Sequence, residues 1–120
     1  MKIFSIVLSF LCLFSINEVL AQNVIKDSLD ATGSRIVAYT PDPGVCSKLI
    51  EIKVSKMNII ESVVFTRGCD GNLKGIGALV KGMKVEDAIE KLKGIPCGRR
   101  KTSCPDQLSS TLEYIISNKK

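Results

Sequence analysis

The chain has 120 residues, with 17 Lys and Arg against 12 Asp and Glu, and it contains no histidine. The length allows one domain. The missing histidine excludes a His general base, a Cys–His dyad and a Cys/His zinc site. The formal net charge is +5, but only 5% of the residues are aromatic. Nucleic-acid binding is therefore disfavoured, because few rings are available to stack on bases between the cations.

Residues 1–21 have the pattern of a signal peptide. Lys2 gives a positive start, residues 3–16 form an apolar run, and residues 19–21 match a cleavage site. A membrane-spanning helix needs about 20 apolar residues, and the polar pair at 17–18 interrupts the run before that length. We expect an exported or periplasmic protein with no membrane span after cleavage if this leader is used, and a cytoplasmic protein otherwise.

Cleavage after Ala21 would remove Cys12 and leave four cysteines in the mature chain. These are Cys46, Cys69, Cys97 and Cys104. The mature core would be small and mostly aliphatic, and domains of this size are often helped by a metal or by disulfides. An even number of thiols suits either kind of support.

Hydrophobic patterning predicts three strands followed by three helices. Residues 22–34 are polar and are interpreted as a linker, so the domain would cover 35–120. The expected strands are 35–40, 49–54 and 59–66, and the expected helices are 73–80, 85–92 and about 105–116. The predicted fold is α+β, in the order β-β-β-α-α-α, with a three-stranded antiparallel sheet and the helices packed on one face.

Each of the four cysteines falls at a junction between predicted elements. Cys46 precedes the second strand and Cys69 follows the third. Both are about equally far from the turn near Met57, so a hairpin would place them at the same end. The helices could bring Cys97 and Cys104 to that end as well. Four converging thiols are the arrangement of a tetrahedral zinc site or an iron–sulfur site, with all four as metal ligands.

The spacing of the cysteines leaves other interpretations open. Successive gaps of 23, 28 and 7 residues contain no C-x-x-C pair. Two disulfides would suit an exported protein, and unlinked thiols are a further alternative. Cys97 and Cys104 also flank the basic run 99–101, and Cys104-Pro105 looks like the entrance to a helix. A thiolate is favoured in such surroundings, so a thiol–disulfide or electron-transfer pair is another hypothesis.

The motifs of the second half resemble one known family. They are Gly68–Ile76, Leu79–Gly82, Gly94–Gly98 and Thr102–Leu108, the last reading Thr-Ser-Cys-Pro-Asp-Gln-Leu. Together they resemble the TSCPD-domain family, and more narrowly its small four-cysteine members. The resemblance covers about residues 35–117, and the four cysteines fall at the family's positions. The small members are of uncharacterised function.

The resemblance also implies a partner. The same domain is found attached to ribonucleotide reductases, so stand-alone members are often labelled as ribonucleoside-diphosphate reductases. These 120 residues do not include the catalytic barrel of such an enzyme. The resemblance therefore implies an accessory, metal-binding role that is not catalytic alone. An exported copy would not meet a ribonucleotide reductase, and the main alternative is then an exported, disulfide-stapled interaction module.

A weaker likeness in layout is to the U-type iron–sulfur cluster scaffolds. In that likeness Cys46, Cys69 and Cys104 would take the three cysteine roles of the scaffold. Cys97 would be an addition, and the scaffold's histidine is missing. A fourth thiolate is more typical of a closed structural site than of transient cluster assembly.

Overall fold

The computed structural model describes residues 22–120, and the predicted signal peptide lies outside the described residues. The described chain forms an antiparallel sheet and three helices, which confirms the predicted α+β class. The strands are β1 (Val24–Leu29), β2 (Arg35–Tyr39), β3 (Leu49–Val54) and β4 (Ile60–Thr66). The helices are α3 (Asp70–Val80), α4 (Val85–Leu92) and α5 (Cys104–Ser117).

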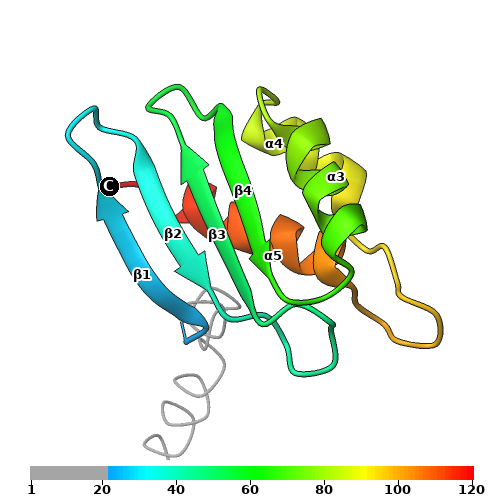
Figure 1. Ribbon diagram of the computed structural model, residues 1–120. Helices are drawn as coiled ribbons and strands as arrows, with labels where there is room; N and C mark the ends of the chain where they lie inside the picture. The colour runs from blue at the N-terminus through cyan, green and yellow to red at the C-terminus, as the bar shows by residue number, and fades with distance from the viewer. Residues whose placement is uncertain (1–21) are drawn as a thin grey trace, which may run out of the picture.

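The sheet has four strands, not the three that were predicted. Its order is β1-β2-β3-β4, with every neighbouring pair antiparallel (Figure 1). The additional strand, β1, lies within residues 22–34, which the sequence had suggested to be a linker. Its sequence, Val-Ile-Lys-Asp-Ser-Leu, is too polar to show a buried face. An ion pair takes the place of apolar burial in holding this strand, since Asp27 on β1 pairs with Arg35 on β2 at 2.7 Å.

One face of the sheet carries the hydrophobic core. Alternate residues of β3 (Ile50, Ile52 and Val54) are at most 1% exposed, as their alternation with charged residues predicts. Helix α5 lies behind this face and contributes Leu108 and Leu112 to the same cluster. Burial of this aliphatic cluster is the main source of stability in a domain with so few aromatic residues.

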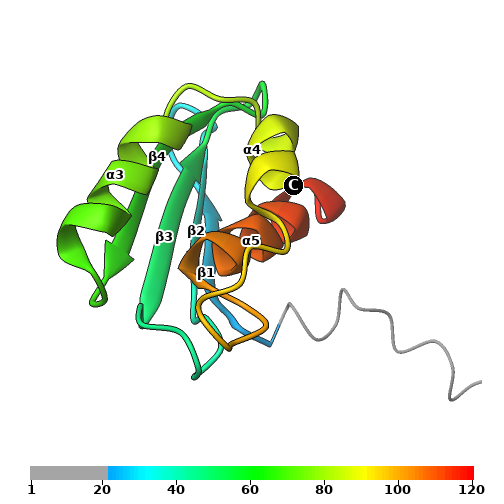
Figure 2. The same cartoon turned by 90° about the vertical axis from the view of Figure 1, so that its right-hand side faces the viewer.

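Helix α3 is placed differently from the other two helices. Figure 2 shows α3 to one side of the strands and α4 with α5 to the other. The expected arrangement had all three helices on one face. Instead α3 runs against the edge strand β4 and approaches its backbone closely, because a Cβ added at Gly77 would lie only 2.6 Å from the carbonyl oxygen of Val63. The end of α3 still reaches the core through Val80.

The β3–β4 hairpin determines which loops meet. Leu49 pairs with Thr66, and the amide of Lys48 donates to the Thr66 carbonyl oxygen at 2.8 Å. Cys46 lies three residues before this pair and Cys69 lies three residues after it. The hairpin prediction is thus confirmed, and both cysteines leave the sheet at the same end.

Candidate thiol site

Three loops gather at the end of the sheet where β3 begins and β4 ends. We call this region the thiol end and define it as residues 45–47, 67–70 and 94–104. In Figure 1 the β2–β3 loop, the β4–α3 turn and the α4–α5 loop all lie at this end. All four predicted site cysteines fall within it, and all four are free thiols. Cys104 is buried, whereas Cys46, Cys69 and Cys97 are exposed.

Cys104 is the most firmly placed of the four thiols. It is the first residue of α5, is 7% exposed and packs with Val45 and Leu73. Its Sγ accepts a hydrogen bond from the Oγ of Ser47 at 3.1 Å, and the Ser47 amide nitrogen lies 3.4 Å from the same sulfur. Two donors from one residue therefore fix the position of this sulfur. Ser47 directly follows Cys46, so the segment that carries one cysteine binds the sulfur of another.

Gly68 allows the β4–α3 turn to approach this segment. Its φ of +95° is a left-handed conformation that suits glycine. An added Cβ would lie 2.8 Å from Cδ1 of Leu73 and 3.3 Å from Cβ of Cys46. Cys69 follows at once as the N-cap of α3, and its side chain makes no capping hydrogen bond. The structure therefore brings the backbone segments of Cys46, Cys69 and Cys104 together, as the sequence predicted.

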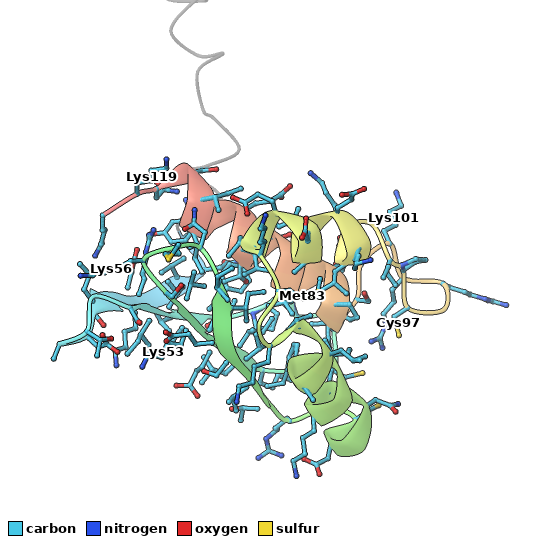
Figure 3. The ribbon with its side chains drawn as sticks, turned by 90° about the horizontal axis from the view of Figure 1, so that it is seen from above. Lys53, Lys56, Met83, Cys97, Lys101 and Lys119 are labelled. Carbon is cyan, nitrogen blue, oxygen red and sulfur yellow. The ribbon has the colours of Figure 1, made fainter. Side chains whose placement is uncertain are left out.

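Cys97 lies on a separate loop, at a short turn closed by a 3.0 Å hydrogen bond from the Arg100 amide to the Cys97 carbonyl oxygen. Figure 3 shows Cys97 and Lys101 on this loop, at one end of the molecule. The loop is tied to the start of α5 because Ser103 Oγ donates to the Ile95 carbonyl oxygen at 2.6 Å. Cys97 forms no disulfide with another of the described cysteines. The cations at 99–101 are exposed, which fits a solvated basic loop.

The polar residues around Cys104 hold the loops in place. Ser103 is the N-cap of α5 and accepts a hydrogen bond from the Asp106 amide at 3.2 Å. The Asp106 carboxylate accepts hydrogen bonds from Thr102 Oγ1 at 2.6 Å and from the Gly94 amide at 2.7 Å. As an acidic residue in the first turn of α5, Asp106 favours the helix dipole. Its second role, the attachment of the α4–α5 loop, is visible only in the fold.

Gln107 joins the β2–β3 loop to the start of α5. Its amide group donates to Asp42 Oδ2 at 3.2 Å, and its Oε1 accepts from the Asp42 backbone amide at 3.1 Å. Gln107 is 5% exposed, so this reciprocal pair is largely shielded from water. Asp42 lies four residues before Cys46. The conformation of the Cys46 loop is thereby fixed by the helix that carries Cys104.

The thiols are not assembled into a ready metal site. Within residues 22–120, no group of three or more His, Cys, Asp or Glu side chains is arranged to hold a metal ion. The donor set nevertheless suits a thiophilic metal, because it consists of sulfur alone and one sulfur already accepts two hydrogen bonds. Sequence reasoning found the cysteines but missed Ser47, since nothing in the pattern singles out a serine next to Cys46.

The fold and the thiol end define a small α+β domain that gathers cysteines from three loops at one end of an antiparallel sheet. Its helix entrance reads Thr-Ser-Cys-Pro-Asp-Gln, and each polar residue of that sequence has a structural partner. The chain belongs to the TSCPD domain family, whose model matches residues 30–116. This match confirms the resemblance noted in the sequence.

No significant match to the chain was found among curated proteins or among solved structures. In the part of the chain from residue 22 onward, no helix has the length and apolar character needed to cross a membrane.

Proposed function

We propose that this protein is a small accessory domain that holds one zinc ion or one iron–sulfur cluster with the thiolates of Cys46, Cys69, Cys97 and Cys104. The observation that carries the proposal is the buried sulfur of Cys104, which accepts two hydrogen bonds from Ser47. Hydrogen bonds of this kind orient and stabilise the thiolate ligands of metal sites. An ordinary core cysteine would not need them.

The chemistry of the other groups supports the same role. The described residues include no histidine, so sulfur is the only soft ligand, and zinc and iron–sulfur clusters are the species that cysteine thiolates select. Four thiolates around a divalent ion would leave an excess negative charge. The exposed cations at 99–101 lie between two of the proposed ligands and would offset part of it.

Binding would require the exposed side chains of Cys46, Cys69 and Cys97 to turn toward Cys104. Because the backbone segments of Cys46 and Cys69 already lie beside Cys104, the loop that carries Cys97 is the remaining piece. Its attachment through Ser103 and Ile95 keeps it next to the start of α5. When bound, the metal would fix this loop, so metal binding and local stability would be coupled.

An accessory role toward a ribonucleotide reductase belongs to the same proposal. It is supported by membership of the TSCPD domain family. The carboxylates in and next to the thiol end have partners within the domain: Asp106 holds the α4–α5 loop, and Asp70 pairs with Lys74 at the surface. We therefore propose a domain that is not catalytic alone and that acts through a larger protein.

Elemental analysis with thiol counting on freshly purified protein tests the proposal. We expect about one zinc ion or one cluster per chain, with thiols that react with a blocking reagent only after a chelator is added. Replacement of Cys104 by Ser should abolish this metal content, while Ser62→Ala, a polar change on the sheet away from the thiols, should leave it intact.

Two results would contradict the proposal. Protein that contains no metal and four oxidised cysteines would instead support the disulfide-stapled module. Protein that contains no metal and four free, reactive thiols but is fully folded would show that the thiols do not need a ligand.

A further inference from the structure

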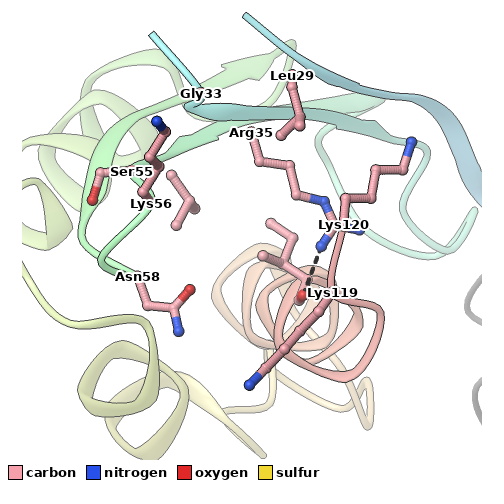
Figure 4. Close-up of a pocket in the computed structure, with 10 residues that line it drawn as sticks. Leu29, Gly33, Arg35, Ser55, Lys56, Asn58, Lys119 and Lys120 are labelled. Carbon is pink, nitrogen blue, oxygen red and sulfur yellow. Dashed lines mark hydrogen bonds between the residues drawn. The ribbon is translucent and has the colours of Figure 1, made fainter.

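A hollow lies at the opposite end of the sheet from the thiols. It has a volume of about 420 Å³, which falls in the range of small-molecule sites. Figure 4 shows how its lining residues face the hollow from the β1–β2 turn, the β3–β4 turn and the end of α5. We call it the basic pocket, and its lining residues are Leu29, Gly33, Arg35, Val54, Ser55, Lys56, Asn58, Ile115, Lys119 and Lys120.

Arg35 provides a fixed, buried cation in this lining. It is 7% exposed. Its Nε and Nη2 donate to the two carboxylate oxygens of Asp27 at 2.9 and 2.7 Å, and its Nη1 donates to the Ile115 carbonyl oxygen at 2.8 Å. Its guanidinium carbon also lies 5.6 Å from the centre of the Tyr114 ring. A guanidinium has five N–H donors, so two remain without a partner among residues 22–120.

Two of the three lysines that line the pocket have no ion-pair partner among residues 22–120. Lys120 lies 3.7 Å from Asp27, but neither Lys56 nor Lys119 forms an ion pair with any residue of the described chain. The ten lining residues include four cationic side chains and no acidic one. Asp27 offsets the charge of Arg35, which leaves Lys56 and Lys119 to give the pocket its positive potential.

The rest of the lining is partly polar, from Ser55 and Asn58, and partly apolar. Val54 belongs to the core, Ile115 is 3% exposed, and Leu29 is 52% exposed although it is a large aliphatic residue. Gly33 leaves room for the stem of Lys56, since an added Cβ there would collide with the Cε of that lysine. An inorganic anion would use only the cations of this pocket. A ligand with an apolar body would use both surfaces.

We propose that the basic pocket binds a small organic anion, a phosphate or carboxylate carried on an apolar ring or chain. The anionic group would lie between Lys56 and Lys119, near the unused N–H groups of Arg35. The apolar body would cover the exposed side chain of Leu29. The site is independent of the thiols, which lie at the other end of β3.

Titration of the protein with phenyl phosphate, followed by heteronuclear NMR, tests the proposal. We expect saturable binding of one molecule per chain, with amide shifts concentrated at residues 54–58 and 115–120. Inorganic phosphate and phenol, the two halves of the probe, should each bind at least about tenfold more weakly, because each uses only one of the two surfaces.

Matched charge variants test whether phenyl phosphate binds in this pocket. The double variant Lys56→Gln with Lys119→Gln should weaken binding of phenyl phosphate by about fivefold or more. The control, Lys81→Gln with Lys91→Gln, removes the same charge from exposed positions elsewhere and should change binding by less than about twofold. Equal weakening by both pairs would overturn the proposal. So would binding of inorganic phosphate as tight as that of phenyl phosphate, or amide shifts centred on the thiol end.

Discussion

The two ends of the sheet are held together in different ways. At the basic end, hydrogen bonds join Arg35 to Asp27 and Ile115, and Tyr114 to Asp27, so the side chains are held in place without a ligand. At the thiol end, hydrogen bonds fix the backbone of the loops, whereas three of the four thiols are exposed and lack a common partner. The comparison indicates that hydrogen bonds hold the basic end in its shape before any ligand binds, whereas three thiols at the other end are still without a common partner.

The largest effect should come from breaking the network at the basic end. Arg35→Met removes the partner of a carboxylate whose side chain is 11% exposed. The free energy of unfolding should fall by about 3 kcal/mol, because the mostly buried carboxylate of Asp27 loses its paired donors and keeps only Tyr114 and the more distant Lys120. Urea denaturation measures this change in the free energy of unfolding. Arg35→Lys, which keeps the charge but not the paired donors, should cost less, and a loss of under about 0.5 kcal/mol for Arg35→Met would show that the network adds little.

A pair of glycine variants tests how firmly α3, the helix whose N-cap is Cys69, is held against β4. Gly77→Ala places a Cβ against the Val63 carbonyl oxygen and should lower the free energy of unfolding by about 2 kcal/mol. Gly75→Ala is the matched control, because its added Cβ meets open space. The control should raise stability by up to about 1 kcal/mol, since alanine is the better helix former.

Thermal or urea unfolding of the two glycine variants gives both values. If Gly77→Ala is as stable as Gly75→Ala, then α3 can move away from β4 without loss. The thiol end would in that case be far less fixed than its hydrogen bonds indicate.

Ser47→Ala tests whether the hydrogen bond to Cys104 contributes to metal binding at the thiol end. It removes the hydroxyl that donates to Cys104 Sγ and leaves every proposed ligand in place. Zinc affinity, measured by competition with a coloured chelator, should fall about tenfold, as for other residues that orient metal ligands. Ser62→Ala serves as the control and should not change the affinity. An unchanged affinity in Ser47→Ala would mean that this hydrogen bond belongs to core packing alone.

The smallest effect concerns acid stability. The hydrogen bond from Arg35 holds the pKa of Asp27 below its usual value, with further help from Tyr114 and Lys120. A carboxyl whose folded-state pKa is lowered stabilises the fold above its unfolded pKa of about 3.9, and that stability is lost as the pH falls toward the folded value. Between pH 5 and pH 3, wild-type stability should fall more steeply than that of Asp27→Asn. If the stability of both proteins falls equally steeply over this pH range, Asp27 is not the source of the acid sensitivity.

Much of the fold could be predicted where apolar residues follow a clear period. Strand β3 alternates cleanly, and α4 has its acids first and its lysine last. Both elements have the predicted bounds. The hairpin register followed from counting residues on each side of the turn, and it correctly placed Cys46 and Cys69 at one end. Strand β1 could not be predicted, because its contribution depends on the ion pair between Asp27 and Arg35.

The candidate site was predictable in its donors but not in their surroundings. The four cysteines are evident from composition. The hydrogen bonds from Ser47 to Cys104 and between Gln107 and Asp42 join residues 57 and 65 positions apart in the chain. Such pairs are set by tertiary packing, which no local pattern encodes.

The central claim is that the four thiols act together as one metal site. Titration of the reduced protein with cobalt(II), followed by visible and near-ultraviolet absorption, tests it most directly, because the spectrum reports both coordination geometry and bound thiolate. We predict saturation at about one cobalt per chain with a tetrahedral, all-thiolate spectrum, and a weaker thiolate band in Cys97→Ser. A spectrum of octahedral cobalt, or one unchanged by Cys97→Ser, would contradict a four-cysteine site.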